Sequence, residues 1–208
     1  MQVVVYGSGG HGKVLADAAE LRGLEVLGFI DDDPSRKGTK VIDIPVLGGV
    51  EALSGLSPRE VEVVVAVGNN AARRALAAKV AKLGFRVASV VHPSAVVSRS
   101  ARLGTGVQLL AQCVVGPGTL VGDGVVVNTG ALVDHDCVLG AYCQVYPGAH
   151  LAGTVTVGEE AYVGTGASVI PGKRIGDRAT VGAGAVVVDD IPEGVVAKGV
   201  PARVSRKV

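Results

Sequence analysis

The chain has 208 residues, a formal net charge of +1 at pH 7 and 48% hydrophobic residues, which is typical of a globular protein of one or two domains. The small net charge argues against nucleic-acid binding, and the absence of a run of about 18 apolar residues argues against a membrane span. The first residues lead straight into an apolar strand without a basic segment or cleavage site, so we expect no signal peptide and a cytoplasmic protein.

Residues 1–90 are predicted to form a small parallel β-sheet flanked by helices, because apolar strand-like runs alternate with helical stretches. The expected strands cover residues 3–6, 24–30, 44–47, 61–67 and 85–91. Helices are expected over residues 13–22, near residues 50–53, and along a stretch whose apolar face contains Ala72, Leu76, Ala77, Val80 and Leu83. This alternation indicates a Rossmann-like α/β domain.

A glycine-rich loop follows the first predicted strand. Residues 7–12 match the pattern G-x-G-x-x-G, and Asp31 ends the second strand 19 residues after Gly12. In a dinucleotide fingerprint, backbone N–H groups of such a loop hold a pyrophosphate and the acid holds a ribose hydroxyl. The domain has room for only one mononucleotide-sized half. NAD, a UDP-sugar and a tight turn without a ligand therefore all remain open, although His11 weakens the last because a bare turn needs no imidazole.

An aliphatic residue recurs every six positions in the second half of the chain. All seventeen positions from Val91 to Val187 are Val, Leu or Ile, and the residue four places later is usually small. Such a repeat is typical of a solenoid, and three hexads suit one turn of a triangular coil, so residues 91–188 predict about five stacked coils. Cys113, Cys137 and Cys143 all take the small inward position, so we expect reduced core residues, no disulfide and no metal site.

The repeat carries one concentration of chemical groups, at Asp134, His135 and Asp136. Val133 is expected to point inward, which places His135 at an outer wall or corner. A carboxylate beside an imidazole raises its basicity and fixes its tautomer, which suits a general base. A solvated turn without chemistry is the alternative that the spacing alone leaves open.

Several motifs then follow one another in a fixed order. They are residues 9–12 (Gly-Gly-His-Gly), 31–32 (Asp-Asp), 68–70 (Gly-Asn-Asn), 92–95 (His-Pro-Ser-Ala), 128–129 (Asn-Thr), 134–137 (Asp-His-Asp-Cys) and 199–203 (Gly-Val-Pro-Ala-Arg). This ordered set resembles the NeuD/PglD-like sugar acyltransferases, a hexapeptide-repeat family of sialic acid O-acetyltransferases and UDP-4-amino-sugar N-acetyltransferases. The resemblance implies a sugar-nucleotide-binding domain over residues 1–90, a left-handed parallel β-helix over residues 91–208, and a homotrimer.

The same resemblance implies acetyl-CoA as co-substrate, bound between adjacent β-helices. It makes His135 the general base, supported by Asp136, for direct attack of an acceptor amine or hydroxyl on the thioester. The positions that match sugar-nucleotide binding are Gly9, Gly10, His11, Asp31, Asp32 and Gly68. The positions that match acetyl-CoA binding are Gly153, Thr165 and Ala183, together with Gln144, where relatives often carry a second histidine. Glutamine can hydrogen-bond an acyl oxygen or a cofactor amide, but it cannot titrate.

We therefore expect an acetyl-CoA-dependent N-acetyltransferase acting on the amino group of a UDP-4-amino-sugar. O-acetylation of a sialic acid or another sugar is the close alternative, and a non-catalytic trimeric nucleotide-binding scaffold is the alternative without chemistry. A zinc-dependent hydratase on the same kind of β-helix needs three converging imidazoles. The 15-residue gap between His135 and His150 does not suit a close pair of ligands, so no metal is expected.

Overall fold

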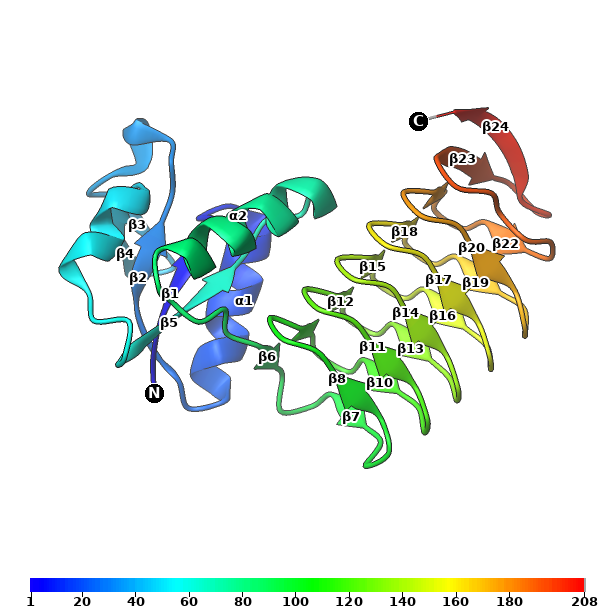
Figure 1. The fold of residues 1–208 in the computed structure, drawn as a ribbon, viewed down its shortest axis with the longest axis horizontal. Coiled ribbons are helices and arrows are strands. Elements are labelled where there is room, and N and C mark those ends of the chain that lie inside the picture. The colour runs from blue at the N-terminus through cyan, green and yellow to red at the C-terminus, as the bar shows by residue number, and fades with distance from the viewer. Residues whose placement is uncertain (208) are drawn as a thin grey trace. The chain divides into compact units, whose positions relative to one another are not determined.

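The computed structural model describes residues 1–207. The chain forms two compact units, Met1–Pro93 and Ser94–Val208 (Figure 1). The sequence predicts the boundary between residues 90 and 91, because the hexapeptide repeat begins at Val91. Among residues 1–207, no helix has the length and apolar character needed to cross a membrane.

The first unit is an α/β domain built on a five-stranded sheet in the order β3-β4-β2-β1-β5. Its elements are β1 (Gln2–Tyr6), α1 (Gly10–Leu21), β2 (Glu25–Ile30), the 3₁₀ helix η1 (Pro34–Arg36), β3 (Lys40–Val41), β4 (Ile44–Gly48), the 3₁₀ helix η2 (Val50–Gly55), β5 (Val61–Val65), α2 (Asn70–Lys82) and β6 (Val90–Val91). Strands β1, β2, β4 and β5 are parallel, whereas β3 pairs antiparallel with β4. The sheet is therefore mixed at one edge rather than fully parallel.

Three predicted elements of this unit differ from the structure. Helix α1 begins at Gly10 rather than residue 13, so His11 lies in its first turn. The helix expected near residues 50–53 is a 3₁₀ helix, η2. The strand expected over residues 85–91 is wrong in extent, because only β6 and a single bridge between Val63 and Val87 form there.

The two α-helices of the first unit differ in the residues at their ends. Asn69 caps α2, since its side chain accepts a hydrogen bond from the backbone N–H of Ala72. Lys79 and Lys82 lie in the last turn of α2, where positive charge is favourable to the helix dipole. Helix α1 has no such side-chain cap, because glycine precedes it. Its first turn therefore has no side-chain partner of this kind at the N-cap.

The second unit is a left-handed parallel β-helix whose coils show as a ladder of short arrows in Figure 1. The first face contains β7 (Val96–Val97), β10 (Val114–Val115), β13 (Leu132–Val133), β16 (His150–Leu151), β19 (Ser168–Val169) and β22 (Val186–Val187). The second face contains β8 (Arg102–Leu103), β11 (Leu120–Val121), β14 (Val138–Leu139), β17 (Thr156–Val157) and β20 (Arg174–Ile175). The third face contains β9 (Gln108–Leu109), β12 (Val126–Val127), β15 (Gln144–Val145), β18 (Tyr162–Val163), β21 (Thr180–Val181), β23 (Val195–Lys198) and β24 (Arg203–Lys207).

The repeat determines both the register and the core of the β-helix. Paired residues in neighbouring coils are one 18-residue turn apart, as Val115 is from Val133. The aliphatic positions from Leu109 to Val187 are all buried, so they fill the interior as the period predicts. Val97 is only half-buried, and Leu103 is 40% exposed. Each coil of a solenoid is buried by the coils on either side of it. Val97 and Leu103 belong to the first coil of the repeat, which has a further coil on one side only, so they are less buried.

Candidate active site

His135 lies at the corner between the first and second faces, in a turn formed by residues 134–137 that we call the His135 turn. Asp136 adopts a left-handed backbone conformation there, with φ of 54°, and Gly118 has the same conformation one coil earlier, with φ of 72°. This left-handed region usually favours glycine, but aspartate tolerates it better than most other residues do. The conformation turns the chain sharply and places two adjacent side chains against each other.

The imidazole of His135 and the carboxylate of Asp136 form a hydrogen-bonded pair. The distance between His135 Nδ1 and Asp136 Oδ2 is 2.9 Å. The backbone N–H of His135 donates to Asp134 Oδ1 at 2.8 Å. Both side chains of the pair are exposed, by 52% and 65%. The hydrogen bond to Asp136, aided by the charge of Asp134, raises the pKa of His135 above its ordinary value. When Nδ1 carries the proton and donates to Asp136, Nε2 is free to act as a base.

Gly153 lies one coil above His135 and makes room for its ring. A Cβ atom at this position would collide with Nε2 and Cε1 of the imidazole. The backbone N–H of Thr154, the next residue, donates to the His135 carbonyl at 2.9 Å. Of the four positions predicted to bind acetyl-CoA, Gly153 is therefore the one that the chain brings directly to the predicted base.

A largely apolar groove of about 690 Å³ runs along the first face beside the His135 turn. Its lining includes Leu132, Asp134, His150, Ala152 and Ile170. Leu132 and Ile170 are exposed there although both are aliphatic. The groove thus offers a hydrophobic surface that begins at Asp134, next to the predicted base.

The other predicted acetyl-CoA positions lie elsewhere on the β-helix. Gln144 belongs to β15 on the third face, and Thr165 and Ala183 lie at the corner between the third and first faces. Gln144 is buried, and its Oε1 atom has no hydrogen-bond partner among residues 1–207. A single chain therefore does not gather these three residues with His135. Their assignment to the acetyl-CoA site stays a prediction.

The glycines of the loop in the first unit divide into two kinds. Gly7 and Gly12 serve close packing, because a Cβ at Gly7 would lie 2.5 Å from the Ala66 carbonyl oxygen and one at Gly12 would collide with the carbonyl of Gly7. By contrast, a Cβ at Gly9 or Gly10 would meet nothing within 4 Å. The same is true of Gly68, in the loop after β5. The fold itself does not explain these three glycines, which border open space.

Asp31 ties the glycine-rich loop to the end of β2. Its Oδ2 atom accepts hydrogen bonds from the backbone N–H of Ser8, at 2.9 Å, and from the Ser8 hydroxyl, while Oδ1 accepts from the N–H of Asp33 at 3.1 Å. Partial burial raises the pKa of Asp31, but the Ser8 hydrogen bonds outweigh it and bring the pKa below its ordinary value. Asp31 therefore remains a carboxylate that orders the loop.

Asp32 makes a separate set of contacts. It accepts a hydrogen bond from the Tyr6 hydroxyl at 2.6 Å and another from the backbone N–H of Val50 at 3.1 Å, and Lys79 Nζ lies 3.9 Å away. These partners come from β1, η2 and α2. Asp32 thus joins three elements at the carboxyl end of the sheet, next to the loop.

Arg36 is a candidate residue that the sequence analysis missed. Its Nη1 donates to the Ser8 carbonyl at 3.2 Å and to the Ser8 hydroxyl at 3.3 Å, which places a guanidinium at the glycine-rich loop. The sequence did contain a helix-start pattern just before Arg36. Asp33 caps η1 by accepting a hydrogen bond from the N–H of Ser35, and Pro34 is the first residue of the helix. This short turn carries Arg36 back toward the loop.

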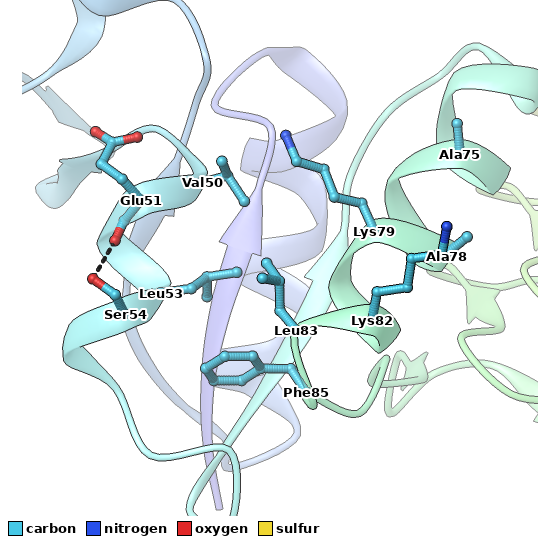
Figure 2. A pocket seen from close by; sticks show the side chains of 10 residues that line it. All are labelled: Val50, Glu51, Leu53, Ser54, Ala75, Ala78, Lys79, Lys82, Leu83 and Phe85. Carbon is cyan, nitrogen blue, oxygen red and sulfur yellow. Dashed lines mark hydrogen bonds between the residues drawn. The ribbon is translucent and has the colours of Figure 1, made fainter.

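A second apolar pocket, of about 490 Å³, lies between η2 and α2 in the first unit. Figure 2 shows Leu53 on one side of it and Leu83 and Phe85 on the other, with Lys79 extending from α2. No predicted site residue lines this pocket. Asp32 approaches it through its contacts with Val50 and Lys79, which are lining residues.

The three cysteines, Cys113, Cys137 and Cys143, are buried, and none of them forms a disulfide within residues 1–207. Among residues 1–207, no group of three or more His, Cys, Asp or Glu side chains is placed to hold a metal ion.

Comparison with known proteins identifies the family. Residues 2–80 match the model of the PglD N-terminal domain. UDP-N-acetylbacillosamine N-acetyltransferase from Bacillus subtilis is 38% identical over 111 residues, which is 52% of this chain and 51% of that protein. The alignment thus spans about half the length of this curated relative.

Solved structures match over nearly the whole chain. The acetyltransferase domain of PglB from Neisseria gonorrhoeae, in complex with acetyl coenzyme A, is 43% identical with a TM-score of 0.92, covering 98% of each chain. PerB from Caulobacter crescentus, in complex with CoA and GDP-perosamine, is 44% identical with a TM-score of 0.93, covering 99% of this chain and 97% of that chain. Identity at this level over full-length matches shows that the chain belongs to the PglD-like family of hexapeptide-repeat sugar N-acetyltransferases.

Proposed function

We propose that this protein transfers the acetyl group of acetyl-CoA to the amino group of a nucleotide-activated 4-amino-sugar, of the UDP-linked type, with His135 as general base. The observation that carries the proposal is the exposed His135–Asp136 pair, whose ring lies over Gly153 on a hexapeptide β-helix. The names of the relatives support the acceptor class, because one acts on a UDP-sugar and another was solved with GDP-perosamine.

The reaction requires one proton transfer that the pair is suited to perform. The neutral acceptor amine attacks the thioester carbonyl carbon of acetyl-CoA, and Nε2 of His135 takes a proton from the nitrogen. The new C–N bond replaces the C–S bond, and CoA leaves with the sulfur, which takes up the proton that the imidazole accepted. Asp136, hydrogen-bonded to Nδ1, stabilises the positive charge that the imidazole acquires. The products are the N-acetylated sugar nucleotide and free CoA.

The first unit supplies the binding site for the nucleotide in this proposal. The open space over Gly9 and Gly10, at the amino end of α1, lets a pyrophosphate approach backbone N–H groups. Arg36 adds a positive charge at the same loop. Asp32, His11 and Gly68 are proposed to contact the rest of the sugar nucleotide, and Asp31 acts by ordering the loop.

We further propose that the active form is a homotrimer with acetyl-CoA between adjacent β-helices. Three observations support it: the apolar groove on the first face, the exposed aliphatic residues that line it, and the predicted cofactor residues on a different face and corner. A neighbouring copy can bring Gln144, Thr165 and Ala183 to the groove of the first. The unpartnered Oε1 of Gln144 is then a natural acceptor for an amide N–H of the cofactor. A cytoplasmic location stays a prediction.

Release of free CoA from acetyl-CoA tests the proposal. The wild type, His135→Ala and the histidine control His92→Asn are assayed with UDP-linked and GDP-linked 4-amino-sugars and with sialic acids. We expect release that requires an amino-sugar, collapses in His135→Ala and persists in His92→Asn. Release only with sialic acids would move the acceptor to a hydroxyl. No release with any acceptor would favour the non-catalytic scaffold.

A further inference from the structure

One side chain beneath the His135 turn departs from the repeat. The hexapeptide pattern has sixteen positions of the kind that usually holds a small residue, from Ala95 to Ala185, of which twelve hold Ala, Cys or Thr, and Thr119 is the only residue among the sixteen with a hydroxyl group. Thr119 is fully buried and lies one 18-residue coil before Cys137, which ends the turn. The proposed chemistry does not use it, and packing alone does not call for a hydroxyl at a position that usually holds alanine.

The Thr119 hydroxyl occupies the place of a backbone hydrogen bond. In many other turns of the β-helix, the N–H of the small residue donates directly to the carbonyl three residues earlier. Examples are Ala131 to Asn128 at 3.0 Å, Ala149 to Tyr146 at 3.1 Å, and Cys143 to Gly140 at 3.2 Å.

In the His135 turn the corresponding groups are the Cys137 N–H and the Asp134 carbonyl. Thr119 Oγ1 donates to the Asp134 carbonyl at 2.8 Å and accepts from the Cys137 N–H at 3.3 Å. The hydroxyl therefore bridges two backbone groups whose counterparts bond directly in the turns that end at Ala131, Cys143 and Ala149. A turn with an inserted hydroxyl is wider than one closed by its own hydrogen bond.

We propose that Thr119 is a positioning residue for His135: its hydroxyl holds the His135 turn open, and this opening sets the imidazole over Gly153 with Nδ1 on Asp136. The rest of the turn is anchored on both sides. The Asp136 N–H donates to the Pro117 carbonyl below at 2.9 Å, and the His135 carbonyl accepts from the Thr154 N–H above at 2.9 Å. Thr119 is the contact that reaches both ends of the turn at once.

Loss of the hydroxyl has a defined consequence. The Asp134 carbonyl and the Cys137 N–H lose their partner, and the turn can satisfy both by closing as the other turns do. Closing moves the backbone that carries His135 and Asp136. A displacement of a catalytic group by about 1 Å costs on the order of 10²-fold in rate. The part of this inference that concerns turnover rests on the proposed function of His135, whereas the effect on the ring does not.

The test compares Thr119→Ala, Thr119→Cys and Thr119→Ser with the wild type. Alanine and cysteine occupy this position in other coils, so both variants are expected to fold. Cys113→Ala, at the same position one hexad earlier, controls for a change of core volume. We measure kcat, the KM for acetyl-CoA, the melting temperature, and the titration of the His135 imidazole by NMR.

We expect kcat to fall by about 10- to 100-fold in Thr119→Ala and Thr119→Cys with little change in the KM for acetyl-CoA. The His135 titration should move toward lower pH in both variants, because the ring loses its alignment with Asp136. Thr119→Ser should keep wild-type behaviour, as should Cys113→Ala.

Folded Thr119→Ala with an unchanged His135 titration and unchanged kcat would overturn the proposal. Equal losses in Thr119→Ser and Thr119→Ala would also overturn it, because the hydroxyl would then not be the group that matters. If His135→Ala turned over like the wild type, the base assignment would fail. The NMR titration would still decide whether Thr119 positions the ring.

Discussion

Substitution of Gly153 by alanine tests the position of the catalytic ring most directly. The backbone of Gly153 does not have the left-handed conformation, so alanine introduces no backbone strain there. Its Cβ would instead collide with Nε2 and Cε1 of His135 and lie 3.1 Å from Cδ2. The exposed imidazole is free to move away, and it must withdraw by about 1 Å to reach an ordinary van der Waals separation.

This displacement carries a cost that can be estimated. Misplacement of a catalytic group by about 1 Å lowers the rate on the order of 10²-fold, which corresponds to about 2.7 kcal/mol of transition-state free energy. We therefore expect Gly153→Ala to lower kcat by about that factor and to leave the melting temperature nearly unchanged. The assay is CoA release at saturating acetyl-CoA and amino-sugar. Gly55→Ala is the control, since its Cβ meets nothing within 4 Å and its backbone conformation is also ordinary.

Wild-type kcat in Gly153→Ala would refute the placement of the His135 ring against Gly153. A rise in the KM for acetyl-CoA with kcat unchanged would also contradict it. That result would assign Gly153 to cofactor contact alone, which is the role that the sequence resemblance implies.

Three further predictions follow from the geometry of the two units. His135 accepts a proton only when it is neutral, and Asp136 raises its pKa above the ordinary 6.5. We therefore expect kcat/KM to rise with pH through a midpoint above 6.5. A flat pH profile across that range would exclude His135 as the base. Asp136→Asn removes the charge that raises the pKa of His135. The profile of kcat/KM against pH for this variant should therefore show a lower midpoint and about a tenfold lower maximum. An unshifted midpoint would contradict the pairing of His135 with Asp136. Arg36→Ala should raise the KM for the sugar nucleotide about tenfold with a smaller change in kcat. Steady-state kinetics with varied sugar nucleotide measure this effect, and an unchanged KM would remove Arg36 from the nucleotide site.

The sequence predicted the β-helix well because its period maps directly onto its geometry. An inward aliphatic residue every six positions determines the faces, the coil length and the core, and the burial of Leu109 through Val187 follows. The first unit was predicted less accurately at its weakest elements. Strand β3 has only two residues, and the segment near Val87 touches the sheet through one bridge, so neither leaves a strong periodic signal. Helix α1 starts within glycines, which sequence rules place outside helices.

The site was predicted where neighbours in sequence are also neighbours in space. His135 and Asp136 meet because they are adjacent and the backbone turns between them. Thr119 and Gly153 lie one coil below and one coil above, and their roles appear only when the coils are stacked. Arg36 reaches Ser8 across 28 positions of sequence, and the local pattern of Asp33 and Pro34 predicts only the short helix that carries Arg36, not its contact with Ser8. The location of Gln144 on the third face follows from the period, but its unpartnered oxygen does not.

The 18-residue register has a consequence for how this enzyme can change over time. From Val96 to Val187 the pairing repeats at that interval, so the height of a residue along this part of the stack depends only on its number, and its face only on its remainder after division by 18. Loss of one residue inside a strand would turn every later inward side chain outward, whereas gain of a whole coil after Val187 would keep the residues around His135 in place. Length variation in such a chain is thus expected in steps of a full coil, or as loops inserted at corners away from residues 134–137.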